Sequence, residues 1–299
     1  MCYNSITIKN QITILEEKTM KKIIALILAG VMLFAFAACK GNDADTVDND
    51  DVISDGGPTT KSDADYITAK GELVIGMTLF APMNYYDSTN NLVGFETEFA
   101  KAVCEKIGIT PKFVEINWDT KEVELNAKNL DCIWNGLTIT DERKANMEIS
   151  TPYMRNKQVM VTKQENLSKY SEGVIGASIV AEQGSAGEEL ATKDEFFKDS
   201  AFTPVDSQAK ALMDVASGTS DIAIVDYVTS IGSIGAGTDF KDLTVISSKE
   251  FSPEEYGIAF RKGSDMATVV NNTIEELMND GTLEVIAKKY KLDDLLIKK

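Results

Sequence analysis

Apolar and polar positions beyond about residue 66 alternate between two periods. Short apolar runs with strand character are separated by segments in which apolar residues recur every third or fourth position, as on one face of a helix. Regular alternation of this kind predicts an α/β fold with mainly parallel sheets. The strand-like runs are 72–77, 111–116, 130–134, 157–162, 173–179, 221–225, 243–247 and 256–260.

The clearest helical pattern lies between the first two strands. Phe95, Phe99, Val103 and Ile107 recur at every fourth position, and Gly108 then gives a helix C-cap signal. Serine and threonine are good N-cap residues, and glycine commonly follows a helix end. These signals predict further helices from Ser207 to Gly218, from Ser264 to Gly281, and from Thr282 onward.

Two stretches of the chain resemble each other weakly. Residues 125–133 and 212–223 both read as a helix, a polar turn, an aspartate and a short apolar strand. This similarity is expected of two lobes that have the same order of helices and strands. Polar residues follow both strands, 135–138 in the first case and Asp226 in the second. Ligands of open α/β sheets bind at the carboxyl ends of strands, so a cleft between two lobes is expected there.

The N-terminal part has the features of an export signal. The apolar run 23–38 follows Met20 and two lysines, and it is shorter than the roughly 20 residues that a membrane span needs. Cys39 comes directly after it, which resembles a bacterial lipobox, although Phe36 stands where leucine is usual. We therefore predict a lipoprotein signal peptide at 20–38 and lipidation of Cys39. A membrane helix and a core cysteine are the alternatives.

The segments on either side of this signal are also interpretable. Because a complete signal begins at Met20, residues 1–19 are predicted to be a mis-start extension. Residues 40–65 are rich in aspartate, glycine and threonine, which predicts an acidic flexible tether. A calcium loop is the alternative, but the glycine and the bidentate glutamate are missing from their required positions.

Composition excludes several classes of function. The formal net charge of -17 would repel phosphate backbones, so no nucleic-acid partner is expected. Histidine is absent, which removes Ser–His and Cys–His nucleophiles and histidine-containing zinc sites. No metal or cofactor is predicted, since the glycines of 232–237 are wrongly spaced for a nucleotide loop. Cys104 and Cys132 could pair in an exported protein, but two buried thiols are slightly favoured.

Seven separated motifs follow one another along the chain: GELVIGMTLFAPMNYYD, NLVGFETEFAKAVCEKIG, LDCIWNGLTITDERKANMEISTPY, EQGSAGE, SDIAIVD, YGIAFRKG and NDGTLEVIAKKY. In this order they resemble the family-3 extracellular solute-binding proteins, the polar amino-acid receptors of bacterial ABC importers. The resemblance covers residues 66–299 and implies a two-lobed periplasmic-binding-protein-like type II fold with a central ligand cleft and two crossover hinge segments. Lobe 1 would comprise 66–156 plus 256–299, and lobe 2 would comprise 157–255.

A free amino acid carries a carboxylate and an ammonium group, and each needs a partner when it is buried. Arginine offers a carboxylate a bidentate fork that lysine cannot. The resemblance makes Arg143 the candidate for the ligand carboxylate and Asp226 the candidate for the ammonium group. A surface arginine paired with Glu142 and an ordinary helix N-cap are the respective alternatives.

The remaining candidate ligand contacts also follow from the resemblance. Backbone and hydroxyl groups would contact the ligand. The ring of Phe80 would cover its aliphatic part, and Trp118 would line the opposite side. Each of these residues could instead be part of the core or a simple helix cap. The candidates are Asn135, Gly136 and Thr138, then Ser185 and Ala186 after Gly184, and the aromatic residues Phe80 and Trp118.

The function expected from this resemblance is capture of a free polar amino acid. Hinge closure at 155–160 and 252–257 would trap it, and a lipid-anchored monomer would deliver it to a membrane permease. A neutral side chain is favoured because no acid stands at 77–78, although Glu182 or Asp119 could serve a cationic one. Arg155 and Lys157 are weak candidates for an acidic one.

Two other classes of function stay open. A dehydratase-like enzyme on the same fold would need Glu182 or a lysine as its acid or base, since histidine is absent. A surface adhesin would be compatible with the lipid anchor and the tether alone. Arg143 and Asp226 would together hold both charges of a zwitterionic ligand, which favours a binding protein over an enzyme.

Overall fold

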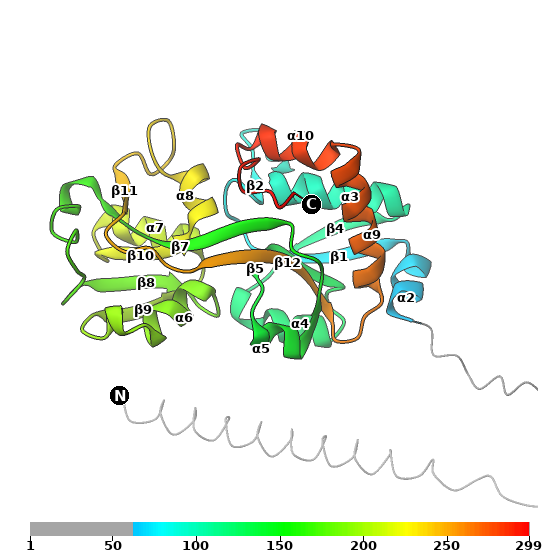
Figure 1. Cartoon of the computed structure of the whole chain (residues 1–299), viewed down its shortest axis with the longest axis horizontal. Helices are drawn as coiled ribbons and strands as arrows, with labels where there is room; N and C mark the ends of the chain where they lie inside the picture. The colour runs from blue at the N-terminus through cyan, green and yellow to red at the C-terminus, as the bar shows by residue number, and fades with distance from the viewer. Residues whose placement is uncertain (1–61, 299) are drawn as a thin grey trace, which may run out of the picture. The chain divides into compact units, whose positions relative to one another are not determined.

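The computed structural model describes residues 62–298, which form mixed α and β structure (Figure 1). The predicted signal peptide, Cys39 and nearly all of the predicted tether lie outside the described residues. The helices are α2 (Asp63–Lys70), α3 (Phe95–Ile107), α4 (Lys121–Asn126), α5 (Asp141–Asn146), α6 (Ala186–Lys193), α7 (Gln208–Ser217), α8 (Tyr227–Ser233), α9 (Met266–Asn279) and α10 (Thr282–Lys289). The strands are β1 (Glu72–Met77), β2 (Tyr85–Tyr86), β3 (Leu92–Val93), β4 (Thr110–Glu115), β5 (Cys132–Thr138), β6 (Met147–Ile149), β7 (Met154–Lys163), β8 (Ser178–Glu182), β9 (Ala201–Val205), β10 (Ile222–Asp226), β11 (Leu243–Ile246) and β12 (Pro253–Arg261).

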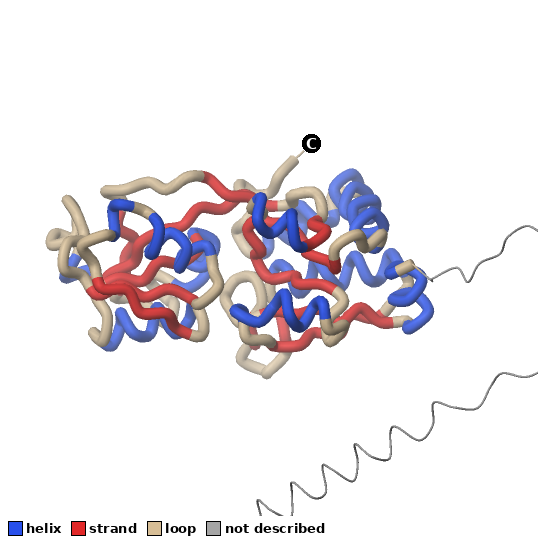
Figure 2. The backbone as a smooth tube through the Cα atoms, turned by 90° about the horizontal axis from the view of Figure 1, so that it is seen from below, coloured by secondary structure: helices blue, strands red, loops and turns tan. Residues whose placement is uncertain are grey.

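The main sheet consists of two groups of strands, and two long strands, β7 and β12, connect the groups. Its order is β4-β1-β5-β12-β7-β10-β8-β9, with β6 on β12 and β11 on β7. We call the β4-β1-β5 group with α2–α5, α9 and α10 the first lobe, and the β10-β8-β9 group with α6–α8 the second lobe. Figures 1 and 2 show these groups side by side, and the labels of Figure 1 identify β7 and β12 as the strands that run between them.

The chain passes between the lobes in two neighbouring strands. Residues 154–157 of β7 pair with 253–256 of β12, and beyond this ladder each strand joins a different partner. β7 continues beside β10 in the second lobe, while β12 continues beside β5 in the first. Both crossing strands are antiparallel to their neighbours, so the sheet is mixed, and the parallel pairs expected from the sequence lie inside the lobes.

Each lobe has its own apolar core. The first lobe buries an aromatic cluster in which Phe99 meets Trp134 edge-on, with ring centroids 4.9 Å apart. The second lobe buries residues of α7 and α6 against β8 and β10. Val228 of α8 is an exception, because it packs with the core of the first lobe. The lobes are therefore in apolar contact in this conformation as well as covalently linked.

Most predicted elements are present at the predicted places. α3 and α7 end at Gly108 and Gly218, which adopt the left-handed conformation as C-caps. The run predicted as a strand at 173–179 is shifted, because β8 begins only at Ser178 and Gly176 has a φ of 72° in the turn before it. Cys104 and Cys132 are buried free thiols, as favoured from the sequence.

The start of the folded part differs from the expected tether boundary at residue 65. The Ser62 hydroxyl accepts the Asp65 N–H at 3.1 Å and caps α2, so the helix already begins at Asp63. Asp63 also pairs with the largely buried Arg261 at 2.8 Å. The capping hydrogen bond and this ion pair therefore hold the start of α2 in the fold, although its composition alone resembles that of a flexible linker. No helix within 62–298 has the length and apolarity that crossing a membrane requires.

Candidate functional site

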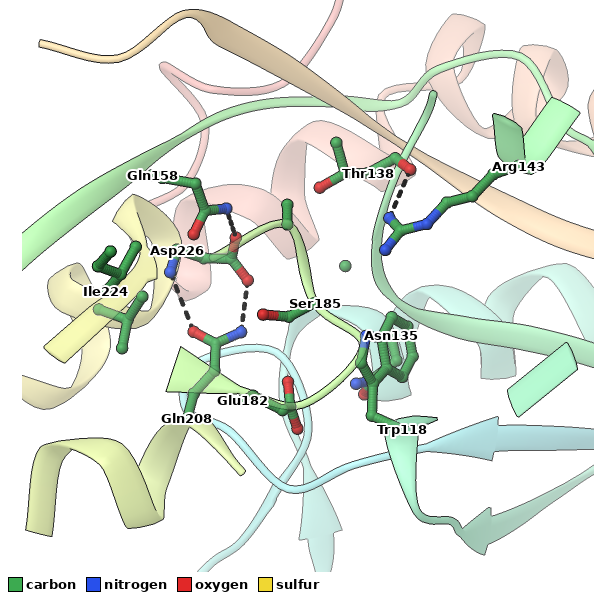
Figure 3. Close-up of a pocket in the computed structure, with 13 residues that line it drawn as sticks. Trp118, Asn135, Thr138, Arg143, Gln158, Glu182, Ser185, Gln208, Ile224 and Asp226 are labelled. Atoms are coloured by element: carbon green, nitrogen blue, oxygen red, sulfur yellow. Dashed lines mark hydrogen bonds between the residues drawn. The ribbon is translucent and has the colours of Figure 1, made fainter. Parts of the chain in front are cut away.

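A small polar pocket lies between the two lobes, at the carboxyl ends of β5, β8 and β10 (Figure 3). Its volume is about 10 Å³, which is room for roughly one water molecule. The two lobes therefore leave little free space between them in this conformation. The first lobe contributes Trp118, Asn135, Gly136, Thr138 and Arg143; the second contributes Gln158, Glu182, Ser185, Ala186, Gln208, Ile224, Val225 and Asp226.

All ligand contacts predicted from the sequence line this pocket except Phe80. The Phe80 ring lies behind the pocket wall, where a Cβ placed on Gly136 would be 3.1 Å from its Cζ. Phe80 is also part of the core of the first lobe. In this conformation its ring supports the backbone of β5 instead of facing the pocket.

Arg143 presents a buried guanidinium group to the pocket. It is the third residue of α5, where its N–H is capped by the Thr140 hydroxyl at 3.1 Å. Its guanidinium donates to two carbonyl oxygens, of Thr138 at 2.7 Å and of Gly184 in the other lobe at 3.3 Å. No carboxylate within 62–298 forms an ion pair with it. Burial lowers the pKa of this group, and only distant acids oppose the effect.

Because its direct acceptors are neutral, Arg143 is an under-compensated buried cation. A ligand carboxylate placed here would gain charge-assisted hydrogen bonds in a setting of low dielectric. A surface arginine, the alternative from the sequence, is excluded by its 9% exposure.

Asp226 provides the opposite charge from the second lobe. It stands at the N-cap position of α8, but its side chain makes no capping hydrogen bond. Instead the carboxylate accepts amide N–H groups from Asn156 at 2.7 Å, Gln158 at 2.6 Å and Gln208. Figure 3 shows the bonds from Gln158 and Gln208. Burial raises its pKa, and these three amides counteract the rise. The arrangement is a buried anion held by neutral donors, which suits a ligand ammonium group better than it suits a cap.

The three amides are the part of the site that the sequence analysis missed. Gln208 also accepts the Asp226 N–H at 3.0 Å, so it fixes both the backbone and the side chain of that residue. Asn156 and Gln158 donate a second time, to Glu254 on the other crossing strand, each at 3.1 Å. Their spacing of two residues on β7 places them on one face of the strand, and this is the signal that could have identified them.

Thr138 and Glu254 join the first lobe to this network. The Thr138 hydroxyl donates to Glu254 at 3.0 Å. Burial raises the pKa of Glu254, and the nearby Asp226 charge acts in the same direction. Gln158 of β7 therefore lines the pocket, and Glu254 of β12 holds Gln158 and Thr138 from beside it, which couples the geometry of the site to the connection between the lobes.

The backbone of Gly136 is held from behind by Glu96. Gly136 has a φ of 55°, and its N–H donates to Glu96 at 2.7 Å. The Tyr153 hydroxyl donates to the same carboxylate. Burial raises the pKa of Glu96 to about 7, although these hydrogen bonds lower it. Glu96 is a positioning residue that keeps β5 in the shape the pocket requires.

Asn135 lines the pocket, but its side chain is occupied elsewhere. Its oxygen accepts from Asn84 at 3.1 Å, and its amide donates to the Thr78 hydroxyl at 2.6 Å. Asn84 donates in turn to Glu96 at 2.9 Å. The amide of Asn135 therefore belongs to a buried network in the first lobe, and the residue presents its backbone to the pocket.

The turn at Gly184 closes the pocket from the second lobe. Its φ is 72°, and its carbonyl accepts from Lys121 at 3.0 Å as well as from Arg143. Lys121 also donates to the Trp118 carbonyl at 3.1 Å, and its Nζ lies 4.8 Å from the centre of the Trp118 ring. Burial lowers the pKa of Lys121 to about 8. The Ser185 hydroxyl, predicted as a ligand contact or a cap, caps α6 by accepting the Glu188 N–H at 3.2 Å.

Comparisons with known proteins agree with this geometry. The chain is 28% identical to the L-cystine-binding protein TcyJ of Escherichia coli (strain K12), over 75% of this chain and 84% of that protein. It is 25% identical to the arginine-binding extracellular protein ArtP of Bacillus subtilis (strain 168), over 91% of this chain and 98% of that protein. It also resembles, with 27% identity and a TM-score of 0.71, an ABC uptake transporter substrate-binding protein of Streptococcus pneumoniae solved with bound histidine. That match covers 80% of this chain and all of the other.

The family model for bacterial extracellular solute-binding proteins, family 3, matches residues 73–293. The match includes both lobes and both crossing strands, and the fold expected from the resemblance is confirmed by these structural neighbours. The relatives are binding proteins rather than enzymes, as the sequence analysis favoured. The chain belongs to the family-3 bacterial extracellular solute-binding proteins.

Proposed function

We propose that the protein is the receptor of an ABC importer that captures a free polar amino acid between its lobes. The observation that carries the proposal is the pair of buried charges, Arg143 in the first lobe and Asp226 in the second, each held only by neutral groups. The ligand carboxylate would bind Arg143 and its ammonium group would bind Asp226. The relatives that bind cystine, arginine or histidine support an amino acid as the ligand.

Capture would occur by hinge closure. Lobe 1 would comprise 66–156 plus 256–299 and lobe 2 would comprise 157–255, with hinges near 155–160 and 252–257. Support comes from β7 and β12, which carry the chain between the lobes at these places. Because the two ligand charges pair with different lobes, an amino acid stabilises the closed state over the open one. The pocket is lined by residues of both lobes, which also supports such a movement.

The closed monomer would then dock on a membrane permease. Lipidation of Cys39 would anchor it outside the membrane, and the acidic tether would let it reach the permease. The relatives described as extracellular and as part of an ABC uptake transporter support this arrangement. Labelling cells with a radioactive fatty acid tests the anchor, because Cys39→Ser should abolish the label.

Thermal unfolding tests ligand capture. The full chain, purified in mild detergent and stripped of bound ligand by unfolding and refolding, is heated with each of the twenty amino acids and with cystine. A ligand at 100 times its Kd adds about 2.7 kcal/mol of stability, which is a shift of several degrees. The proposal predicts such a shift with one or a few amino acids. Absence of a shift with every one of them would contradict it.

A further inference from the structure

We propose that Glu182 selects the ligand by binding a cationic nitrogen beyond the α-ammonium group, so the receptor prefers amino acids that carry a second positive nitrogen. This inference rests on the proposed function, since it assigns the side-chain end of the same pocket. It departs from the expectation of a neutral side chain, which relied on the lack of an acid at 77–78.

Glu182 ends β8, and Asp226 ends the neighbouring parallel strand β10, so both carboxylates lie at the same edge of the second lobe. Figure 3 shows Glu182 among the residues around the pocket, in the region of Trp118 and Gln208. Only 3% of Glu182 is exposed, and its Oε1 has no hydrogen-bond partner among residues 62–298. A buried acceptor that lacks a hydrogen bond costs free energy, so a ligand group that donates to this oxygen would bind favourably.

Charge balance indicates the kind of donor. The residues that line the pocket include one cation, Arg143, and two acids, Asp226 and Glu182. The zwitterionic part of any amino acid matches Arg143 and Asp226 and leaves the Glu182 carboxylate uncompensated. A ligand with one further positive charge neutralises it, whereas a neutral side chain leaves a buried, unpaired anion or requires Glu182 to keep a proton.

The other charged groups facing Glu182 do not neutralise it directly. Lys121 of α4 approaches from the first lobe, but its Nζ is committed to the carbonyls of Trp118 and Gly184. Burial and the Asp226 charge raise the pKa of Glu182 to about 8, and Lys121 opposes them. Without ligand the group therefore holds a proton at neutral pH, and a cationic ligand nitrogen would displace that proton.

Two sources could supply the second nitrogen. One is a cationic side chain, as in arginine, lysine or ornithine. The other is the distal ammonium group of cystine, whose second carboxylate would also need a cation beside Glu182, and Lys121 is the cation in that position. Lys121→Met separates the two sources, because it removes the partner of the second carboxylate and should weaken cystine binding by a larger factor than it weakens the binding of a purely cationic side chain.

Isothermal titration calorimetry of the full chain tests the assignment. Its ligands are the twenty amino acids, ornithine, cystine and citrulline, the neutral analogue of arginine. Its variants are Glu182→Gln and the matched control Glu195→Gln, which removes the same charge from a side chain that is 89% exposed. We expect the tightest ligand to carry a second cationic nitrogen. Glu182→Gln should weaken that ligand about 10- to 100-fold, and Glu195→Gln should leave its affinity unchanged.

A second readout follows the proton that the cationic nitrogen displaces from Glu182. Titrations at pH 7 in two buffers with different ionisation enthalpies give the number of protons released on binding. We expect release of most of a proton per ligand from the wild type and little from Glu182→Gln. Preference for a neutral amino acid, with unchanged affinity in Glu182→Gln, would overturn this inference and leave the proposed function standing. Failure of the wild type to bind any amino acid would instead overturn the proposed function.

Discussion

Replacing Arg143 by methionine separates ligand binding from folding. Methionine keeps much of the buried side-chain volume and removes the positive charge and the donors to Thr138 and Gly184. Truncating one partner of a buried, hydrogen-bonded charge pair costs about 2–5 kcal/mol of binding free energy. The affinity for the amino-acid ligand should therefore fall by roughly 30- to several thousand-fold.

The effect of Arg143→Met on stability should be small by comparison. Two carbonyls lose a donor, which is unfavourable, but a buried cation without an ion-pair partner is removed, which is favourable. Calorimetry gives the Kd, and urea unfolding without ligand gives the free energy of unfolding. Lys144→Met is the matched control, because Lys144 is an exposed cation next to Arg143 in the same helix, α5. An affinity within threefold of the wild type in Arg143→Met would refute the assignment of the ligand carboxylate.

The remaining predictions concern the second lobe. Asp226→Asn should weaken binding by a similar factor in calorimetry, and unchanged binding would reject the ammonium site. Gly184→Ala should weaken binding, because its Cβ would lie 3.0 Å from the Asp119 Cα across the cleft. Gly176→Ala is the control, because Gly176 has the same φ of 72° and no atom lies within 4 Å of the place of its Cβ. Equal effects of the two substitutions on affinity would contradict this. Burial raises the folded-state pKa of Glu182 from 4.5 to about 8. The free energy of unfolding without ligand should therefore fall as the pH rises from about 5 to 7, by up to about 1.4 kcal/mol per pH unit. It should fall less steeply in Glu182→Gln.

The elements that the sequence predicted well are those whose pattern is local. α3 and α7 have apolar residues at helical spacing and glycine caps, and both end where the glycines stand. Arg143 and Asp226 followed from motif resemblance, and the fold brings them to one pocket. These features need only neighbouring residues or family pattern to be recognised.

The features that the sequence did not predict depend on partners distant in the chain. Gln208 opens α7 and reads as an ordinary polar helix residue, yet it meets Asp226 across the fold. Asn156 and Gln158 acquire their role only when β7 places them beside Asp226 and Glu254. Phe80 sits behind Gly136 in place of lining the pocket, and no local pattern distinguishes these two places.

The central claim is that one amino acid bridges the two lobes through its own charges. A crystal structure of the protein with the ligand found by thermal unfolding tests it most directly. We predict the ligand carboxylate within hydrogen-bond distance of the Arg143 guanidinium and the ligand ammonium group within the same distance of the Asp226 carboxylate. A ligand that contacts only one lobe, or that lies outside the pocket between Arg143 and Asp226, would contradict the account.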